Sequence, residues 1–524
     1  MEEKKDAITP SATTLEQTSS PPTTKPDEHV LHFESQDAAW RDQTTKKLLR
    51  KIDLHLLPFL IVMYLLNFLD RSNLAQARQG TLEKDLGMTN TDFNLATSIF
   101  FVGYLLMQLP SNLLITRLRP SRYLTAAMAL WGGVSACNAA THSLGQLVAV
   151  RFFLGFVEAP FFPGAVFLMS SWYTRAELTR RMSYFYSGNA LANMFGGIIG
   201  AAVLGNMEGA QGIAGWRWLF IIEGVITIFV AMIAVFVLPD YPRTTTWLSE
   251  EERAFASWRL LADINEADEA KAKGLLAGLK LALTDYRLYL FVLLQHLSLL
   301  SQTFQYFFPS IVQTLGYGKI ETLWLTVPVW FATFLISVCV TFTSAKTRDR
   351  SIHIFCLMLL SATGNAIATG STALPARFFA MFLMPMGAVS ACKSPVLLGT
   401  IVSQHLADAP SDQILLAWIA NSFPRPTVKR SASLAIANMF GNTASIYGSY
   451  MYPSSTAPQY VPGGSTNAVV CLLVGSLAIA LRYIHKWENK KLEKAEREDA
   501  ANAEAGVTAD ADVDRRALGF RYVY

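Results

Sequence analysis

Charged residues are scarce in this chain, and those present are unevenly spread. Asp, Glu, Lys and Arg make up 16% of the 524 residues, whereas 52% are hydrophobic. A soluble protein has about a quarter charged residues, so the composition excludes an ordinary soluble class. The charges gather at both ends of the chain, in residues 240–287, and in short clusters between long apolar runs. Runs of about 20 apolar residues cross a bilayer as helices, because only a helix satisfies its own backbone groups in lipid.

Cysteine is equally scarce, and its spacing fits neither a metal site nor a disulfide framework. The five cysteines fall mostly inside apolar runs and are typical of small packing residues: Cys137, Cys339, Cys356, Cys392 and Cys471. The net charge of +4 shows no basic face, so no nucleic-acid partner is expected. The chain has no P-loop, which argues against an ATP-driven pump. We expect no enzymatic activity, no metal and no cofactor.

The chain also lacks a signal-peptide core at its start. Residues 1–44 are rich in Pro, Ser and Thr, and we expect a disordered cytoplasmic tail there. The first span must then act as the insertion signal. At the other end, residues 491–524 are expected to form a second cytoplasmic tail.

The apolar runs predict an all-α membrane protein with twelve spans in two six-helix bundles, residues 45–239 and 287–490. The spans are placed near 55–76, 92–116, 122–141, 145–171, 182–205, 216–238, 287–309, 321–344, 351–372, 375–421, 430–451 and 466–486. A charged, helix-favouring segment, 240–286, separates the two sets and is expected to be a cytoplasmic linker.

The positive charges predict the orientation, because cytoplasmic loops of membrane proteins collect Lys and Arg. One side of the predicted topology receives most of them: Lys46, Lys47, Arg50, Lys51, Arg117, Arg119, Arg122, Arg175, Arg180, Arg181, Lys346, Arg348, Arg350, Lys429, Arg430, Arg482, Lys486 and Lys490. Both termini are therefore predicted to be cytoplasmic.

The tenth span contains an anomaly. Its two apolar pieces are separated by residues 392–412, whose polar half has no place inside a bilayer. Removing about twenty residues would join the pieces into one helix of ordinary length. Two hypotheses stay open: a translated, unspliced intron, or a genuine broken helix with a cytoplasmic loop.

Several ordered segments resemble one branch of the major facilitator superfamily, the fungal anion:cation symporters related to allantoate permease. These segments are Lys51–Pro58, Tyr64–Asn73, Gln108–Asn112, Arg119–Arg122, Arg151–Gly155, Glu158–Pro163, Gly215–Trp218, Leu238–Pro242 and Lys429–Ser431. The resemblance covers about residues 45–490 and implies the major facilitator fold. Two departures stand out. Asp349 lies in an unusual loop where the family carries an Asp-Arg pair, and Ala75 replaces a family Gly.

A small set of charged residues falls inside the predicted spans, where an unpaired charge costs several kcal/mol and so asks for a function. By resemblance, Arg71 binds the carboxylate of an organic anion, and Asp70 and Glu158 accept protons. Arg151 and Glu158 lie about two helical turns apart on one helix face. The resemblance implies that Arg151 pairs with Glu158. Structural readings stay open for each: Asp70 and Arg71 could snorkel to the interface, and Arg151 could close its helix against neighbours. Glu223 is expected to be a helix-packing residue.

Polar side chains elsewhere in the spans are further candidates for orienting a substrate by hydrogen bonds. They are Asn189, His296, Gln302, Tyr306, Asn438 and Asn442. Each could instead bond a neighbouring helix, as Asn often does in membranes.

These features predict a secondary transporter, a proton-coupled symporter of a small organic anion that works by alternating access between the two bundles. The alternatives are a membrane nutrient sensor and an uncoupled facilitator of the same fold. The expected partners are the anion, protons and the lipid bilayer, and the chain is expected to act as a monomer. Plasma membrane is the family default, with other endomembranes left open.

Overall fold

The structure is a computed structural model. It describes most of the chain between Phe33 and Glu504, in these ranges: 33, 35–115, 118–265, 275–347, 349–392, 415, 418–419, 422–423 and 427–504. Residues 393–412, on which both hypotheses about the tenth span depend, lie outside this part. The described residues are helical and contain no strand, so the all-α prediction is confirmed.

A first helical set precedes residue 240. It comprises α2 (Ala38–Ala77), α3 (Leu82–Asp85), α4 (Asn90–Ile115), α5 (Pro120–Cys137), α6 (Leu144–Glu158), α7 (Phe161–Ser170), α8 (Arg175–Asn206) and α9 (Gly215–Val237). The predicted fourth span is thus broken between α6 and α7. Pro160 stands at this break, where its ring removes a backbone donor that an unbroken helix would use.

A second helical set follows two short helices of the linker, α10 (Glu250–Asn265) and α11 (Leu275–Leu283). It comprises α12 (Tyr286–Ser301), α13 (Phe308–Gln313), α14 (Lys319–Thr347), α15 (Arg350–Gly370), α16 (Leu374–Cys392), α19 (Thr427–Gly448) and α20 (Val461–Glu504). The predicted seventh span is broken between α12 and α13 by a short 3-10 turn, Thr303–Tyr306.

Seven helices in the described residues are long and apolar enough to cross a membrane. They lie within Ala38–Ala77, Leu144–Ser170, Gly215–Val237, Lys319–Ser337, Arg350–Gly370, Leu374–Ala391 and Val461–Glu498. The remaining predicted spans also coincide with helices, but the count of twelve stays a prediction.

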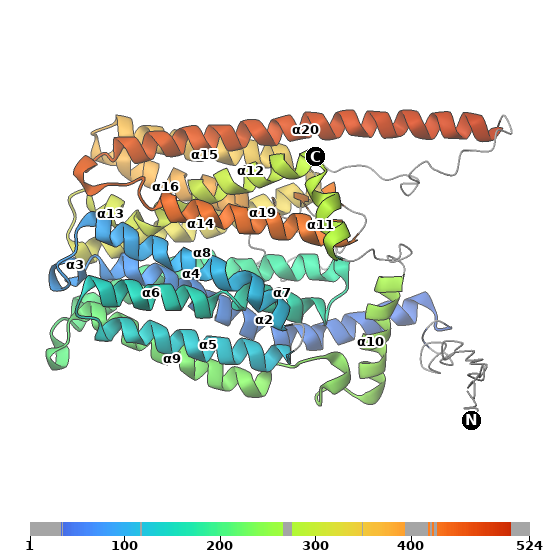
Figure 1. Cartoon of the computed structure of the whole chain (residues 1–524), viewed down its shortest axis with the longest axis horizontal. Coiled ribbons are helices and arrows are strands. Elements are labelled where there is room, and N and C mark those ends of the chain that lie inside the picture. The colour runs from blue at the N-terminus through green and yellow to red at the C-terminus, as the bar shows by residue number, and fades with distance from the viewer. Residues whose placement is uncertain are drawn as a thin grey trace, which may run out of the picture.

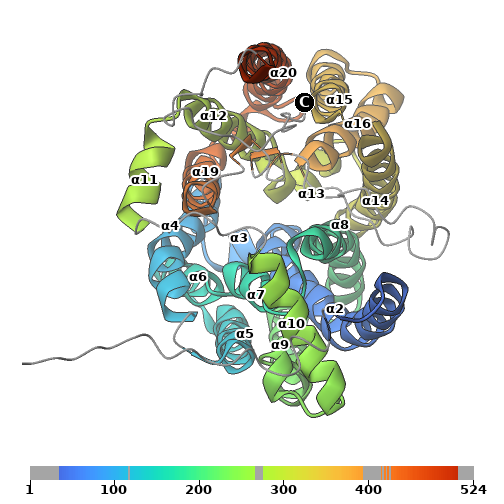
Figure 2. The ribbon, with the colours of Figure 1, turned by 90° about the vertical axis from the view of Figure 1, so that its right-hand side faces the viewer.

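The two sets pair their helices in the same order. In the first set α2 packs on α8, α4 on α6, and α5 on α9. In the second set α12 packs on α19, α14 on α16, and α15 on α20. Figure 2 shows the two sets facing each other, with α4 and α8 of the first beside α19 and α14 of the second. The same pairing in both sets is what an internal repeat produces.

The two ends of the helix assembly differ. The start of α2, the helix α10 and the end of α20 lie at one end, which we call the linker end, and α3 lies at the other, the α3 end (Figure 1). At the α3 end, one apolar cluster joins both sets and includes Phe93, Trp216, Phe307 and Trp330. At the linker end, the buried apolar residues of the two sets form separate clusters, and partly buried Tyr306 and Ile446 of the second set pack against the cluster of the first set. The sets are therefore joined at the α3 end.

Polar contacts between the sets follow the same division. Gln79 donates to the Ser310 hydroxyl at 3.3 Å, and Lys319 donates to the Gly80 carbonyl at 3.0 Å, both at the α3 end. Deeper in the assembly, the Ser98 hydroxyl donates to a carbonyl of α19 at 2.7 Å.

Helix α10 is fastened to the first set. Arg259 of α10 pairs with Glu177 of α8 at 2.6 Å, and Glu252 pairs with Lys51 of α2 at 2.5 Å. Beside these ion pairs, Phe255 of α10 packs edge to face against Phe33. The linker helix therefore belongs mechanically to the first set.

Candidate functional site

The candidate site lies where α2, α4 and α6 meet, and two glycines allow the helices to come this close. A Cβ at Gly155 of α6 would lie 1.9 Å from the Phe100 carbonyl oxygen, and a Cβ at Gly103 of α4 would lie 2.2 Å from the Phe152 carbonyl oxygen. Only glycine fits at both positions. The close crossing brings the two charged residues of α6 against α4 and α2.

An ion pair forms the centre of the site. Arg71 of α2 donates from Nε to the carboxylate of Glu158, which ends α6. The Glu158 side chain is fully buried, whereas 13% of the Arg71 side chain is exposed. Arg71 therefore neutralises a buried carboxylate while keeping part of its own surface open to solvent.

Aromatic rings surround the Arg71 guanidinium. Its central carbon lies 5.1 Å from the Phe68 ring centre, 5.3 Å from that of Phe100 and 4.9 Å from that of Tyr104. A cation over an aromatic face is attracted by the ring quadrupole, which holds the guanidinium in place without using its N–H donors. The rings therefore position Arg71 while leaving its donors able to turn to a ligand.

Arg151 does not pair with Glu158, contrary to the expectation from the family resemblance. It donates to the Ala96 carbonyl at 3.5 Å and lies over the Phe100 ring at 5.1 Å. Its Nη1 is buried without a hydrogen-bond partner in the described structure. The helix spacing places both residues on one face, but Arg71 reaches Glu158 from α2 and takes the carboxylate.

The second set contributes Tyr306, from the turn that breaks the seventh span. Its ring lies 5.6 Å from the Phe101 ring, and it is close enough to interact electrostatically with Arg71, Arg151 and Glu158. Of the predicted residues in the second set, Tyr306 is the one that the structure brings to the ion pair.

Asp70 does not take part in the ion pair, although it is next to Arg71 in sequence and close enough to Glu158 to interact electrostatically. It is completely buried and accepts hydrogen bonds from Trp131 at 3.1 Å, Ser135 at 2.5 Å and Thr227 at 3.4 Å. Neighbouring residues on a helix point in different directions, so Asp70 faces α5 and α9 while Arg71 faces α6. Asp70 and Arg71, predicted to act together, therefore lie on different faces of α2.

The other predicted polar residues mostly bond within the helices. Asn189 accepts from Asn193 one turn later, and Asn438 accepts through its carbonyl from Asn442. Gln302 donates to the carbonyl of Ser298 in its own helix.

His296 bonds across to α19, where its ring nitrogens meet the Phe440 carbonyl at 2.9 Å and the Tyr447 hydroxyl at 2.5 Å. None of these contacts, nor those of the three amide side chains above, reaches the ion pair.

Sequence reasoning missed Phe100, Tyr104 and Asn67. Phe100 and Tyr104 are one helical turn apart on α4, a spacing that placed them on a common face but did not reveal Arg71 as their partner. Asn67 lies beside Glu158, one turn before Arg71. Its position on the face of Arg71 was the available signal.

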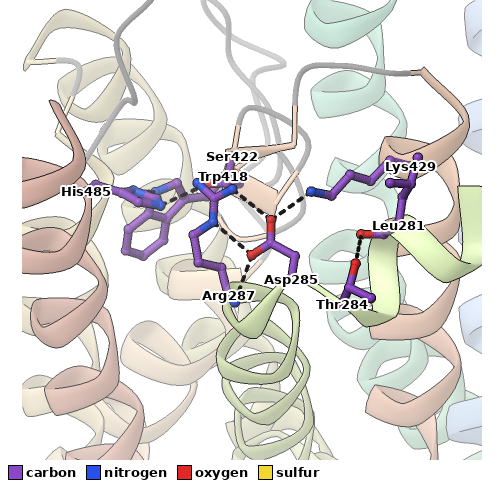
Figure 3. A network of polar contacts seen from close by, with 8 residues as sticks. All are labelled: Leu281, Thr284, Asp285, Arg287, Trp418, Ser422, Lys429 and His485. Atoms are coloured by element: carbon purple, nitrogen blue, oxygen red, sulfur yellow. Dashed lines mark hydrogen bonds and ion pairs between the residues drawn. The ribbon is translucent and has the colours of Figure 1, made fainter. Parts of the chain in front are cut away.

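A separate polar network lies at the linker end of the second set (Figure 3). Asp285, which caps α12, accepts from Arg287 and Lys429, with 2.7 Å and 2.8 Å ion pairs. Burial alone would raise the pKa of Asp285, but the hydrogen bonds from these two cations outweigh it and hold the pKa well below its ordinary value of 3.8. Figure 3 shows His485 beside this network, bonded to Trp418 at 3.2 Å.

Sequence comparison identifies relatives that match most of the chain. The Major Facilitator Superfamily description matches residues 60–411. MFS transporter prlL of Fungal sp. (strain NRRL 50135) is 32% identical over 467 residues, 86% of this chain and 88% of that protein. Major facilitator-type transporter hxnP of Emericella nidulans is 30% identical and covers 88% and 90%. A protein of Agrobacterium vitis named "Putative tartrate transporter" is 33% identical and covers 67% and 79%.

Solved structures share the fold. A D-xylose-proton symporter matches with a TM-score of 0.60 at 13% identity, over 81% of this chain and 97% of that one. A bacterial homologue of the lysosomal transporter Spinster, in an inward-facing conformation, matches with a TM-score of 0.59 at 14% identity, over 86% and 97%. The chain therefore belongs to the Major Facilitator Superfamily, as a multi-pass membrane protein of a family of transporters.

Proposed function

We propose that the chain is a proton-coupled symporter of a small organic anion, working by alternating access. The observation that carries this proposal is the Arg71–Glu158 ion pair, with a second buried arginine, Arg151, nearby. A guanidinium is permanently charged and matches a carboxylate with two parallel donors. A carboxylate paired with the guanidinium can take up a proton, and the neutral acid then no longer needs the arginine as a partner.

The coupling follows from competition for Arg71. When Glu158 takes up a proton, it no longer needs a cation, and the Arg71 donors become available to a substrate carboxylate. Arg151 then offers its free Nη1 to the same anion, and Tyr306 offers a hydroxyl from the second set. Release of anion and proton lets Arg71 return to Glu158. Asp70 is the second proton acceptor in this proposal. It does not contact the Arg71–Glu158 pair and acts on it through α2, the helix that carries both Asp70 and Arg71.

The direction of access is part of the proposal. The linker end corresponds to the side that collects positive charge, so we place it in the cytoplasm together with both termini. The two sets are joined at the α3 end and apart in their described apolar clusters at the linker end. This arrangement corresponds to a transporter open toward the cytoplasm.

The finer identity is also proposed. The ordered motifs support the anion:cation symporter branch, and the relative named for tartrate supports a carboxylate substrate. Asn189, His296, Gln302, Asn438 and Asn442 remain proposed substrate contacts for a state in which the two sets have moved. We place the monomeric transporter in the plasma membrane.

An uptake screen with matched pairs of compounds tests the proposal. Cells expressing the chain are offered labelled carboxylates, tartrate and nicotinate included, each beside its neutral amide. We expect at least one acid and no amide to accumulate, and we expect Arg71→Lys to lose about 100-fold in kcat/KM because a point charge replaces a two-pronged donor. Accumulation of the amides, or full activity of Arg71→Lys, would contradict the proposed role of Arg71.

A further inference from the structure

Glu223 is a buried carboxyl that the proposed transport cycle does not use. It lies on α9, opposite α2, and only 1% of its surface is exposed. Gly224 follows it, and a Cβ there would lie 2.7 Å from the Gly132 carbonyl oxygen, so α9 and α5 cross in direct contact at this level. Glu223 is therefore sealed inside the first set, away from the Arg71–Glu158 pair.

The partner of Glu223 is an amide and not a cation. Asn73 of α2 donates from Nδ2 to Oε2 of Glu223. Asp70, one turn earlier on α2, is the group that interacts with Glu223 electrostatically. In the part of the chain that the structure describes, neither Glu223 nor Asp70 forms an ion pair. Two negative charges buried this close without a cation would cost far more than one.

Two oxygen atoms at this contact have no hydrogen-bond partner in the described structure. They are Oε1 of Glu223 and Oδ1 of Asn73, and both belong to side chains that are almost completely buried. Two acceptors cannot satisfy each other. A single proton on Oε1 of Glu223 would allow the acid to donate to the amide oxygen while the amide N–H donates to Oε2, which gives each of the two oxygen atoms a partner.

We propose that Glu223 holds a proton in this structure, as a neutral carboxylic acid paired with Asn73, next to an ionised Asp70. The hydrogen bonds of Asp70 fit this division. Trp131, Ser135 and Thr227 all donate to it, and a carboxylate is a group that only accepts. The geometry therefore assigns the charge to Asp70 and the proton to Glu223, so that one charge is buried and not two.

The assignment changes how the first set stores protons. Asp70 receives three donors and can remain charged only while its neighbour is neutral. If the proposed proton-coupled transport is correct, a proton arriving at Asp70 would lower the cost of ionising Glu223, so that the pair as a unit holds one proton. Glu223 is thus a positioning residue for the coupling carboxyl and does not touch the substrate.

Infrared spectroscopy reads this proton without knowledge of the substrate. Purified full-length protein in lipid nanodiscs at neutral pH is compared with Glu223→Gln, Asp70→Asn and Glu252→Gln. We expect the difference spectrum of Glu223→Gln to show complete loss of one C=O band of a protonated carboxylic acid. The linker control Glu252→Gln should keep the band. Asp70→Asn should make the band disappear at a lower pH than in the unaltered protein, because the negative charge beside Glu223 is gone.

A second variant covers the case in which Glu223→Gln does not fold. Asn73→Leu keeps the acid but removes its partner, so the band should shift and not disappear. A band that survives in Glu223→Gln, a band that does not shift in Asn73→Leu, or no such band in the unaltered protein would each overturn the proposal. None of these results depends on uptake. Failure of the proton on Glu223 therefore leaves the proposed transport function standing, and the converse also holds.

Discussion

Each helical set has an ion pair that joins two of its helices at the linker end, but the interiors of the two sets differ. In the first set, Arg181 of α8 donates to both carboxylate oxygens of Asp53 on α2, at 2.8 and 2.9 Å, and lies 4.6 Å from the Tyr173 ring centre. This joins the first and fifth spans beside the end of the fourth.

The second set repeats this arrangement with other residues. Lys429 of α19 pairs with Asp285 before α12 at 2.8 Å and lies 5.5 Å from the Phe423 ring centre. The seventh and eleventh spans are thus joined like the first and fifth. Because the ion pair joins the corresponding helices in both sets, we attribute it to the internal repeat and not to the transport mechanism.

The interiors diverge where the chemistry is proposed. Gln302 follows Asp285 by as many residues as Asp70 follows Asp53, so the acid of the first set corresponds to a neutral amide in the second. Arg71, Arg151 and Glu158 are buried or nearly so in the first set. The first set therefore contains the buried charges on which the proposed coupling rests, while the second set contributes Tyr306 to the ion pair.

The largest effect on stability is expected from breaking the central pair. Arg71→Met leaves the fully buried Glu158 without a cation, and we expect a loss of about 3 kcal/mol in the free energy of unfolding. The measurement is denaturant unfolding of the purified protein in detergent. The double variant Arg71→Met/Glu158→Met replaces both charges by apolar groups of similar size and should recover most of the loss. A double variant no more stable than Arg71→Met would contradict the pairing.

A smaller loss of stability is expected when either of the two linker-end ion pairs is broken, and the loss should differ between them. Asp285 is only 8% exposed and faces two cations, whereas Asp53 is 32% exposed and faces one. We expect Asp285→Asn to cost about 2 kcal/mol and Asp53→Asn about 1 kcal/mol. Lys51→Ala, at a half-exposed ion pair, is the matched control and should change stability by less than about 0.5 kcal/mol. Equal losses for the two Asp variants would remove the distinction.

The pH dependence of stability gives a further test of the ion pairs around Asp285. The pKa of Asp285 is held below its ordinary value of 3.8, so its contribution to stability is complete above that pH and is lost as the pH falls below it. The free energy of unfolding of the unaltered protein should therefore fall below about pH 4, and it should fall less in Asp285→Asn. An unchanged decline in Asp285→Asn would show that other groups cause it.

The fold was predictable because hydrophobic runs and loop charges directly report spans and their order. The break at Pro160 follows from its ring, but the break before Phe308 depends on packing that no periodicity reveals. The charged residues of the site could be predicted from the sequence, but the ion pairs that they form could not. Arg151 and Glu158 share a helix face, yet the choice of Arg71 as partner depends on how closely α2 approaches α6. The contact between Asn73 and Glu223 joins helices far apart in sequence and left no local signal.

In the proposed transport cycle, Glu158 couples proton uptake to substrate binding through Arg71. The most direct measurement compares accumulation driven by a pH gradient with exchange at equal pH, in liposomes containing Glu158→Gln and a labelled carboxylate accepted by the unaltered protein. We predict that Glu158→Gln loses gradient-driven accumulation about 100-fold while exchange stays within about threefold, because a permanently neutral glutamine side chain at this position leaves Arg71 free for the anion. Gradient-driven accumulation at the unaltered level would contradict the claim.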